Sequence, residues 1–538
     1  MMNYPFRLKL HPVLLSSILL ILAGCAQNSE KQKPVKNDSL TKKETDIQGY
    51  FSNQERIHTD SLQVNAFFKN YPQLKDYAND VFQFYGYRQF HYAWYDDRGL
   101  TEQASNLLNH LNNLDLEGVQ AKVPYMSILD SLINNPEGVN EPHPDLEILL
   151  SAEYFFYAEK VWGGIPEEQT NKLSWFLPRK KLNLPYLMDS LLRDSAASLF
   201  TDNYSIRQYN LLKTALRKYR QIDSAGNWEM LPKPAIALKK QDSSELVGRL
   251  RHRLYLLGDL RVDSGNELFD DSLEAAVKSF KNRNGWTPDG VAGEALFREI
   301  NTPPKDIEQK IMINMERARW LPIVRSQQFI TINIPSFTLS VYDQDTVTFT
   351  MNVVVGKDVH QTVIFNGDIK YVVFCPYWNV PPSIMKKEIL PAIQKNPGYL
   401  SKNNMEWNGN SIRQKPGPAN SLGLVKFLFP NSYNIYLHDS PAKSLFKAQT
   451  RAFSHGCIRL SEPKKLAVYL LKDDPQWTEA KITAAMNAGK EKYVTLKNPV
   501  PVFIGYLTAW VGPNGKLNLR KDIYKRDKSL ADMLFKTE

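Results

Sequence analysis

A cysteine and a histidine late in the chain are the residues best suited to acyl transfer. Cys457 stands in the string Ser454-His455-Gly456-Cys457-Ile458-Arg459, and His438 lies upstream of it. A free thiol, with a pKa near about 8.5, is only slightly ionised at neutral pH. A histidine within hydrogen-bond reach raises the thiolate fraction and can then protonate a leaving amine. The pair therefore predicts a cysteine nucleophile with His438 as its base.

The residues around the cysteine have types that would support this chemistry. Arg451 and Arg459 add positive charge, which favours a thiolate. Gly456 lets the backbone approach a substrate without a side chain in the way. The amides near Gly456 and Cys457 are candidates to hold a developing oxyanion. We expect His455 to be a neighbour of the site and not the primary base.

Two short elements must position the histidine and the cysteine. The stretch Tyr433 to Asp439 is expected to be a strand, with Ile435 and Leu437 on one face and His438 on the other. Ser461-Glu462-Pro463 has the residue types of a helix start. The nucleophile is therefore expected in a tight segment between a loop and a helix.

The sequence around these elements predicts strands and an insertion. Period-two alternation over residues 329–334, and in the runs around 347–355 and 369–374, predicts a mainly antiparallel sheet. A long mixed stretch, 383–426, interrupts this pattern. Loops of this length are usually functional or partly structured. We interpret it as a lid over the site, with a passive excursion as the alternative.

The earlier part of the chain has helical patterns. Through residues 50–240 apolar residues recur at helical spacing, which we interpret as packed helices without chemistry of their own. In 243–300, Leu250, Leu254 and Leu257 share one helix face, Gly258 can end that helix, and Asp270 or Asp271 can cap a second. These patterns indicate a separate small helical module.

The sequence has a basic net charge but no motif that indicates a nucleic-acid partner. The chain has 538 residues, of which 43% are hydrophobic, enough for about three or four domains with packed cores. The net charge of +10 comes from 67 basic and 57 acidic residues, and no basic tract is interleaved with aromatics. We expect ordinary surface charge, with attraction to an anionic envelope polymer or membrane as the alternative.

The three cysteines are too few for a disulfide framework. Cys375 follows an expected strand, 370–374, and is interpreted as a buried structural thiol. No Cys/His spacing typical of zinc occurs, so we expect neither a metal nor an organic cofactor.

The first residues resemble the signal of a bacterial lipoprotein. A short basic region precedes an apolar run, Val13 to Ala23, which is too short to span a bilayer comfortably. Leu22-Ala23-Gly24-Cys25 is similar to a lipobox, which implies lipid attachment at Cys25; a plain signal peptide is the alternative. The polar run 27–48 reads as a tether. Resemblance to Gram-negative lipoproteins implies the periplasmic side of the cell envelope, at the outer membrane.

The string around Cys457, with His438 upstream, resembles the motif of the L,D-transpeptidase catalytic domain of the YkuD type. The resemblance implies that His438 is the base and that the carbonyl of Asp439 orients it. Simple members have His-Gly-Thr where this chain has His438-Asp439-Ser440, which leaves the role of that glycine open. The expected catalytic residues are Cys457, His438, Asp439, Gly456, Arg459 and His455.

The resemblance extends to the large, scaffold-bearing members of this family. It rests on Val355-Gly356-Lys357, on Tyr377-Trp378-Asn379-Val380-Pro381-Pro382, and on a tail hairpin followed by Asp522-Ile523-Tyr524. It rests also on the module at 243–300, whose Trp286 to Gly293 is similar to a three-helix peptidoglycan-binding module. That module could instead be a spacer that no longer binds glycan. The residues expected to bind substrate are Trp378, Asn379, Tyr436 and Ser454, although Trp378 and Asn379 could instead be a core aromatic and a turn residue.

The fold expected is α+β and multidomain. It comprises a helical scaffold domain, a small three-helix peptidoglycan-binding module, and a mainly antiparallel β catalytic domain with a capping insertion. The expected boundaries are 1–24 for the lipoprotein signal peptide, 25–49 for the tether, 50–240 for the scaffold, 243–300 for the module, 327–500 for the catalytic domain with its insertion at 383–426, and 501–538 for a C-terminal hairpin and tail.

The implied reaction is peptidoglycan crosslinking. Cys457 would attack a tetrapeptide stem at its third residue and release D-alanine, and a neighbouring stem would take the thioester to give a 3-3 crosslink. Water as acceptor would make an L,D-carboxypeptidase, and a protein amine would attach a protein to the wall. A non-catalytic peptidoglycan-binding lipoprotein is the rival from another class. Expected partners are stem peptides, glycan, a membrane through the lipid anchor, and wall-synthesis proteins; carbapenems should acylate Cys457.

Overall fold

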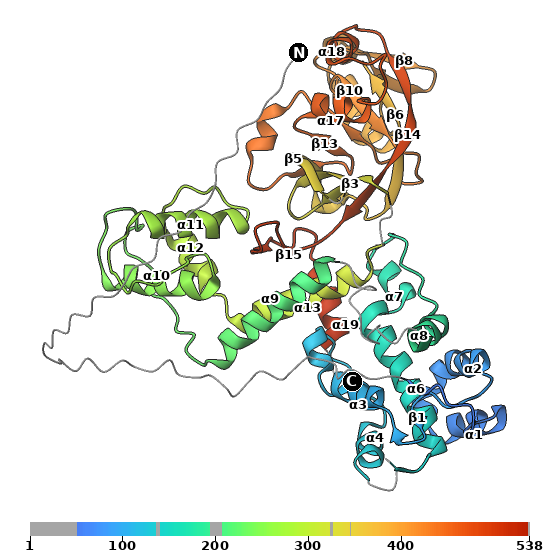
Figure 1. Cartoon of the computed structure of the whole chain (residues 1–538). Helices are drawn as coiled ribbons and strands as arrows, with labels where there is room; N and C mark the ends of the chain where they lie inside the picture. Colours follow the sequence, from blue (N-terminus) through green and yellow to red (C-terminus); the bar gives the residue numbers. More distant parts are fainter. Residues whose placement is uncertain (1–50, 136–139, 194–206, 323–325, 345, 536–538) are drawn as a thin grey trace, which may run out of the picture. The chain divides into compact units, whose positions relative to one another are not determined.

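The computed structural model describes residues 51–135, 140–193, 207–322, 326–344 and 346–535 (Figure 1). The expected signal peptide, the lipidation site Cys25 and the tether lie outside these residues. No helix in the described ranges is long and apolar enough to cross a membrane.

The N-terminal part of the described chain is helical. A central helix, α6 (Pro144–Ala158), is buried on all sides from Leu146 onward because the surrounding helices pack around it. Its N-terminus is capped by the side chain of His143, and Pro144 occupies the first helical position. The other main helices are α1 (Ser61–Asn70), α2 (Ala78–Tyr87), α3 (Glu102–Asn112), α4 (Met126–Ile133), α7 (Glu167–Lys172), α8 (Leu184–Arg193) and α9 (Arg207–Ser224).

The small module folds as its local sequence predicts. It contains α10 (Glu245–Leu257), α11 (Asp271–Arg283) and α12 (Glu294–Ile300) around a core of its own. Gly258 ends α10 with a φ of +82°, which a glycine adopts without strain. Asp270 caps α11 by accepting from the Leu273 amide at 2.9 Å. The following helix, α13 (Pro304–Arg319), shares a second core with α9.

The C-terminal part is built on a nine-stranded, mainly antiparallel sheet, as the sequence predicts. Strand order is β12-β5-β13-β11-β10-β6-β14-β3-β4, and a further pairing of β4 with β5 closes the sheet on itself. The parallel pairs are β11 with β13, β12 with β5, and β14 with β3. The strands are β3 (Gln328–Asn333), β4 (Thr338–Asp343), β5 (Thr346–Gly356), β6 (Asn366–Phe374), β10 (Val425–Leu428), β11 (Leu437–His438), β12 (Ala452–Ser454), β13 (Ile458–Leu460) and β14 (Lys492–Gly505).

The insertion expected at 383–426 folds into a small unit with its own core, but the unit begins earlier, at Trp378, and residues 425 and 426 already belong to β10 of the main sheet. Three short strands, β7 (Trp378–Asn379), β9 (Ser411–Gln414) and β8 (Met405–Asn408), form a separate sheet. Helical segments α14 (Pro382–Ile384), η6 (Met385–Ile389), α15 (Leu390–Lys395) and α16 (Tyr399–Lys402) accompany it. Its buried core consists of Val380, Ile389, Met405 and Ile412. We call this unit the cap.

The chain after the sheet returns to earlier elements. The hairpin expected within 501–538 begins later than that boundary, because β14 runs on to Gly505 and β15 (Ala509–Val511) starts only after it. β15 pairs with β16 (Leu517–Leu519), and both pack in the core shared by α9 and α13. The last helix, α19 (Arg526–Phe535), contributes Leu530 to the core of the sheet.

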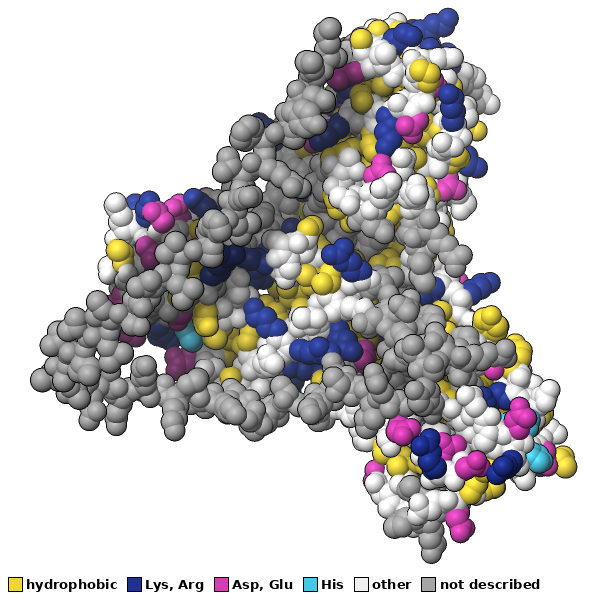
Figure 2. All heavy atoms as spheres, in the orientation of Figure 1, with side chains coloured by type: hydrophobic (Ala, Val, Ile, Leu, Met, Phe, Trp, Pro, Cys, Tyr) yellow, Lys and Arg dark blue, Asp and Glu magenta, His cyan; other side chains and the backbone are white. Residues whose placement is uncertain are grey.

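Basic and acidic side chains are interspersed on the visible face of the molecule (Figure 2). Ion pairs between such side chains include Lys464 with Glu479 at 2.8 Å and Lys472 with Asp343 at 2.8 Å. Mixed charge of this kind fits the expectation of ordinary surface charge.

Candidate active site

The register of two strands brings the predicted catalytic residues together. β11 and β13 run parallel, with Leu437 opposite Ile458 and His438 opposite Arg459. Since side chains alternate between faces along a strand, His438 and Arg459 lie on the face opposite the core residues Leu437 and Ile458. Cys457 directly precedes β13, two residues before Arg459, and is therefore a diagonal neighbour of His438.

His438 is held as a neutral base. Only 4% of the residue is exposed, and its Nδ1 donates to the carbonyl of Asp439 at 2.5 Å. Because a carbonyl oxygen can only accept, this bond leaves Nε2 with its lone pair free for a proton. Burial and then the charge of Arg459 lower the pKa of His438 to about 3, against the carbonyls of Asp439 and Leu422, which face the ring and oppose the shift.

Asp439 is fixed by a hydrogen-bond cage of its own. Its carboxylate accepts from the Leu424 amide at 2.9 Å and from Lys443 Nζ at 2.5 Å. Gly423 has a φ of +62°, and a Cβ there would collide with the Asp439 side chain. The φ of Asp439 is not positive, so the backbone conformation at this position does not require the glycine that simple family members have there.

Cys457 is a partly exposed thiol on the same face. Its Sγ lies 3.6 Å from the carbonyl of Asn434. Burial raises the pKa of the Cys457 thiol, while hydrogen bonds from Tyr436 and the charge of Arg459 lower it. Within the described chain no hydrogen bond joins this sulfur to His438. The resting pair is therefore a thiol and a neutral imidazole, one strand apart.

The loop before Cys457 has a fixed internal geometry. Gly456 has a φ of +113°, a conformation that side chains strongly disfavour. Its amide donates to Ser454 Oγ at 3.1 Å, and Ser454 Oγ donates to the Cys457 carbonyl at 2.5 Å. The Cys457 amide has no acceptor among the residues that the structure describes, so it remains available for an oxyanion.

The two arginines near the cysteine do different things. Arg459 faces the site, its Nε is buried without a partner, and its charge acts on both Cys457 and His438. Arg451 instead binds the carbonyls of Phe337 at 3.2 Å and Ala448 at 3.0 Å. The expectation that both arginines favour the thiolate therefore applies only to Arg459.

His455 connects the cysteine loop to the cap. Its Nε2 donates to Glu388 Oε1, in η6 of the cap, at 3.0 Å. On its other side the ring lies against His360, with centroids 5.0 Å apart. This placement makes His455 a contact between the loop and the cap, and η6 is a π-helical turn of the kind often found at functional sites.

The residues expected to bind substrate lie in three places. Tyr436 is half-buried and contacts the Cys457 sulfur, which together with burial raises the pKa of Tyr436. Ser454 is buried, and its hydroxyl is engaged within the loop. Trp378 and Asn379 lie in β7 of the cap, paired with Gln414 and Arg413. The substrate contacts of all four stay predictions.

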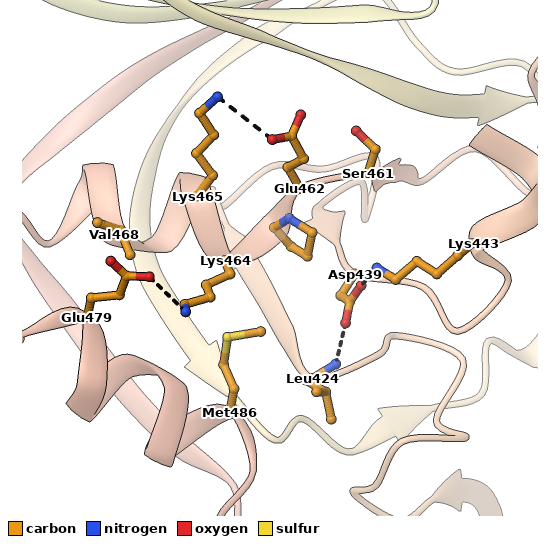
Figure 3. A pocket seen from close by; sticks show the side chains of 11 residues that line it. Leu424, Asp439, Lys443, Ser461, Glu462, Lys464, Lys465, Val468, Glu479 and Met486 are labelled. Atoms are coloured by element: carbon orange, nitrogen blue, oxygen red, sulfur yellow. Dashed lines mark hydrogen bonds and ion pairs between the residues drawn. The ribbon is translucent and has the colours of Figure 1, made fainter. Parts of the chain in front are cut away.

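A cavity of about 530 Å³ is lined by Asp439, the residue after His438, and by neither His438 nor Cys457 (Figure 3). Asp439 is the one predicted site residue in its lining, together with the Asp439 partners Leu424 and Lys443, and ion pairs such as Lys465 with Glu462 line it. No group of three or more metal-binding side chains occurs in the described ranges. Cys375 is 1% exposed, and its Sγ donates to the Met486 carbonyl at 3.2 Å.

Sequence reasoning missed the residues that support this site from a distance. Thr362, Gly423, Lys443 and Glu388 each contact a predicted catalytic residue or the loop before Cys457. Tyr524 contacts Thr362. Only Gly423 carries a local signal, since a glycine before a strand can mark a close backbone approach.

Comparisons with known proteins agree with the geometry. Residues 327–482 match the family model of the L,D-transpeptidase catalytic domain. Residues 79–216 match a model described as "Scaffold domain", and residues 243–300 match one described as "Putative peptidoglycan binding domain".

One curated relative covers most of the chain. A Haemophilus influenzae protein named "Putative L,D-transpeptidase" is 30% identical over 448 residues, which are 73% of this chain and 89% of that protein. Among solved structures, an L,D-transpeptidase from Stackebrandtia nassauensis is 14% identical with a TM-score of 0.21, over 50% of this chain and 96% of that one. The LD transpeptidase LdtMt1 in complex with imipenem is 16% identical with a TM-score of 0.18, over 33% and 58%. The two structural matches carry no weight beside the sequence relation. By that relation and by the catalytic-domain match across His438 and Cys457, this chain belongs to the cysteine-dependent L,D-transpeptidases.

Proposed function

We propose that this chain forms 3-3 crosslinks in peptidoglycan through a thioester on Cys457. The observation that carries the proposal is the pairing of β11 with β13, which places Cys457, His438 and Arg459 on one face of the sheet. A free amide at Cys457 completes the set of groups that acyl transfer needs.

The first step makes the thioester. Cys457 Sγ attacks the carbonyl carbon of the third residue of a tetrapeptide stem, and its proton passes to Nε2 of His438. The Cys457 amide stabilises the oxyanion. The carbon–nitrogen bond to the terminal D-alanine then breaks, and His438 gives the proton to the leaving amine. Because Cys457 and His438 rest as a thiol and a neutral imidazole, the thiol proton moves to His438 while the sulfur attacks the carbonyl carbon, and not before.

The second step passes the acyl group to an acceptor. The side-chain amine of a neighbouring stem attacks the thioester, and His438 takes one of its protons. The carbon–sulfur bond breaks, and the proton returns to the Cys457 sulfur. Water in place of the amine gives an L,D-carboxypeptidase, and the chemistry at Cys457 and His438 is the same.

The remaining parts of the chain would bring the site to its polymer. The match of residues 243–300 to a peptidoglycan-binding model supports a peptidoglycan substrate. We further propose that the module holds glycan strands, and that a lipid on Cys25 anchors the chain at the periplasmic face of the outer membrane. Wall-synthesis proteins remain proposed partners.

Product analysis tests the proposed reaction. The purified protein and its Cys457→Ala variant are each incubated with disaccharide-tetrapeptide, and the products are identified by mass spectrometry. A crosslinked dimer with release of D-alanine, from the wild type alone, is expected. Tripeptide without dimer would show a carboxypeptidase, and an unchanged substrate with both proteins would contradict an intrinsic activity.

A carbapenem offers a second test of the same thiol. The imipenem complex belongs to a relative, but a carbapenem would be an acyl donor for Cys457 here as well. The wild type should gain the mass of one imipenem, and Cys457→Ala should not. An imipenem adduct on Cys457→Ala would contradict this part of the proposal.

A further inference from the structure

Thr362 hydrogen-bonds the peptide unit that joins Gly456 to Cys457. This threonine is fully buried in the turn after β5. Its hydroxyl donates to the carbonyl of Gly456 at 2.8 Å and accepts from the amide of Gly356 at 2.9 Å. The single hydroxyl proton is therefore committed to the Gly456 carbonyl.

Tyr524 closes the same turn from the C-terminal segment. Its hydroxyl accepts from the Thr362 amide at 3.2 Å and donates to the Gly356 carbonyl at 2.6 Å. The residue is 4% exposed, so these bonds do not compete with bulk water. One phenol thus ties together both ends of the turn that carries the Thr362 hydroxyl.

The position of Tyr524 is itself fixed by its neighbours. Its amide donates to the Tyr506 hydroxyl at 2.9 Å, and the two rings stack with centroids 5.6 Å apart. Tyr506 donates in turn to Asp522 at 2.5 Å. Asp522 also accepts from the amides of Arg526 and Asp527 at the start of α19. The tyrosine is therefore part of a rigid network and not a loose tail.

Holding the Gly456 carbonyl orients the Cys457 amide. In a trans peptide the carbonyl and the N–H of one unit point in opposite directions. Because Thr362 holds the carbonyl on one side, the Cys457 N–H is directed to the other, where no described residue accepts it. A glycine at a φ of +113° could otherwise turn this peptide easily.

We propose that Tyr524 is a positioning residue for acyl transfer, acting through Thr362 to keep the Cys457 amide aimed at the oxyanion. The proposal rests on the proposed thioester chemistry and assigns part of it to a residue outside the matched catalytic domain, which ends at 482. Tyr524 does not touch the reacting atoms.

The proposal distinguishes two reactions of the same thiol. Acylation by imipenem passes through an oxyanion, whereas alkylation by iodoacetamide is a displacement at carbon that forms none. Loss of one oxyanion donor costs about 10²–10³-fold in rate, and a misaligned donor costs part of that. Tyr524→Phe should therefore slow acylation by about 10- to 100-fold and leave alkylation within about twofold of the wild type.

The experiment uses the full-length protein and measures both rates by intact mass at one pH. Thr362→Val should slow acylation as Tyr524→Phe does. Thr362→Ser keeps the hydroxyl and should be acylated at the rate of the wild type. Tyr469→Phe is the matched control, because Tyr469 is another buried tyrosine of the sheet core, whose hydroxyl lies 3.3 Å from Asp343. It should leave both rates unchanged.

Three outcomes would overturn the proposal. Equal acylation rates in wild type and Tyr524→Phe would show that the phenol does not act on the amide. A parallel loss of acylation and alkylation would show general disruption of the loop. A wild type that imipenem does not acylate would contradict the thioester chemistry itself, and with it this inference.

Discussion

His438 and Arg459 lie opposite each other in the parallel pairing of β11 with β13. After burial, the charge of Arg459 is the main cause that lowers the pKa of His438 to about 3, and the same charge opposes the raised pKa of Cys457. One guanidinium therefore keeps the base neutral and also stabilises the thiolate that forms during attack. The first effect opposes transfer of the thiol proton to the imidazole and the second favours it, so the two groups rest as a thiol and a neutral imidazole.

Replacing Arg459 with glutamine should make the thiol harder to ionise. The pKa of Cys457 should rise, because burial already raises it and the opposing positive charge is removed. The pH profile of iodoacetamide alkylation should move to higher pH, and imipenem acylation should slow by at least about tenfold. Arg459→Lys keeps a charge and should return the profile toward that of the wild type. An alkylation profile identical in Arg459→Gln and wild type would refute this role.

The rate of acylation should be nearly flat between about pH 5 and pH 8. Burial and Arg459 hold the pKa of His438 at about 3, so the base is already neutral across this range. Burial also raises the pKa of the Cys457 thiol, so the pair keeps one proton until the pH is alkaline. The measurement is kcat/KM for imipenem acylation against pH. An acid limb with an apparent pKa near about 6.5, the ordinary histidine value, would contradict the account.

Gly456→Ala should lose activity out of proportion to its loss of stability. An added Cβ would meet only the Gln361 carbonyl at 3.8 Å, so the cost arises from the φ of +113° and not from a collision. Strain of about 1–3 kcal/mol would shift the loop and misplace the Cys457 sulfur and amide. Acylation should fall by about 100-fold or more while Tm falls by a few degrees.

The matched control for this variant is Gly489→Ala. Gly489 also has a positive φ, +69°, with nothing near its added Cβ, and it lies outside the site. It should lose similar stability and keep the acylation rate of the wild type. Equal activity in Gly456→Ala and Gly489→Ala would mean that the loop geometry is unimportant.

Glu153 in α6 should make the helical region less stable as the pH rises. Its carboxyl is fully buried, both oxygens lack a partner, and burial raises its pKa to about 9 from 4.5. Between these pH values the carboxyl of the folded protein holds a proton that the carboxyl of the unfolded chain has lost. The contribution of this proton to the free energy of unfolding is therefore complete below pH 4.5 and is lost as the pH rises to about 9, by at most about 1.4 kcal/mol per pH unit.

Glu153→Gln should remove this dependence, because the amide does not ionise. Calorimetric unfolding at several values from pH 5.5 to pH 8.5 should show a shallower fall of Tm in the variant than in the wild type. Identical slopes for the two proteins would mean that Glu153 is paired or hydrated in solution.

The module at 243–300 and the helix after Cys457 could be predicted because their signals are local. Gly258, Asp270 and Pro463, which is the first residue of α17 (Pro463–Leu470), lie within one helical turn of the helix end that they mark, whereas Glu462 before α17 makes no side-chain cap hydrogen bond. The motif around Cys457 and His438 was likewise readable from the sequence, and the register of β11 and β13 places both residues on one face of the sheet, while their catalytic roles stay predictions.

Other features depend on contacts that no local pattern records. The strand expected at 433–439 is wrong except at Leu437 and His438, because Asn431 binds the amides of Tyr433 and Ile435 and forms a turn there. The cap strands, of two to four residues, are too short for a period to be visible. Thr362 and Tyr524 meet across 162 positions of sequence, a contact that only the folded sheet creates.

The most direct test of the central claim is the mass of the protein during turnover. Wild type and Cys457→Ala are mixed with disaccharide-tetrapeptide, quenched with acid at early times, and analysed intact and after proteolysis. The account predicts that the wild type gains the mass of the donor minus D-alanine, located on Cys457, and that the variant gains none. An acyl group on any other residue, or D-alanine release by Cys457→Ala, would contradict it.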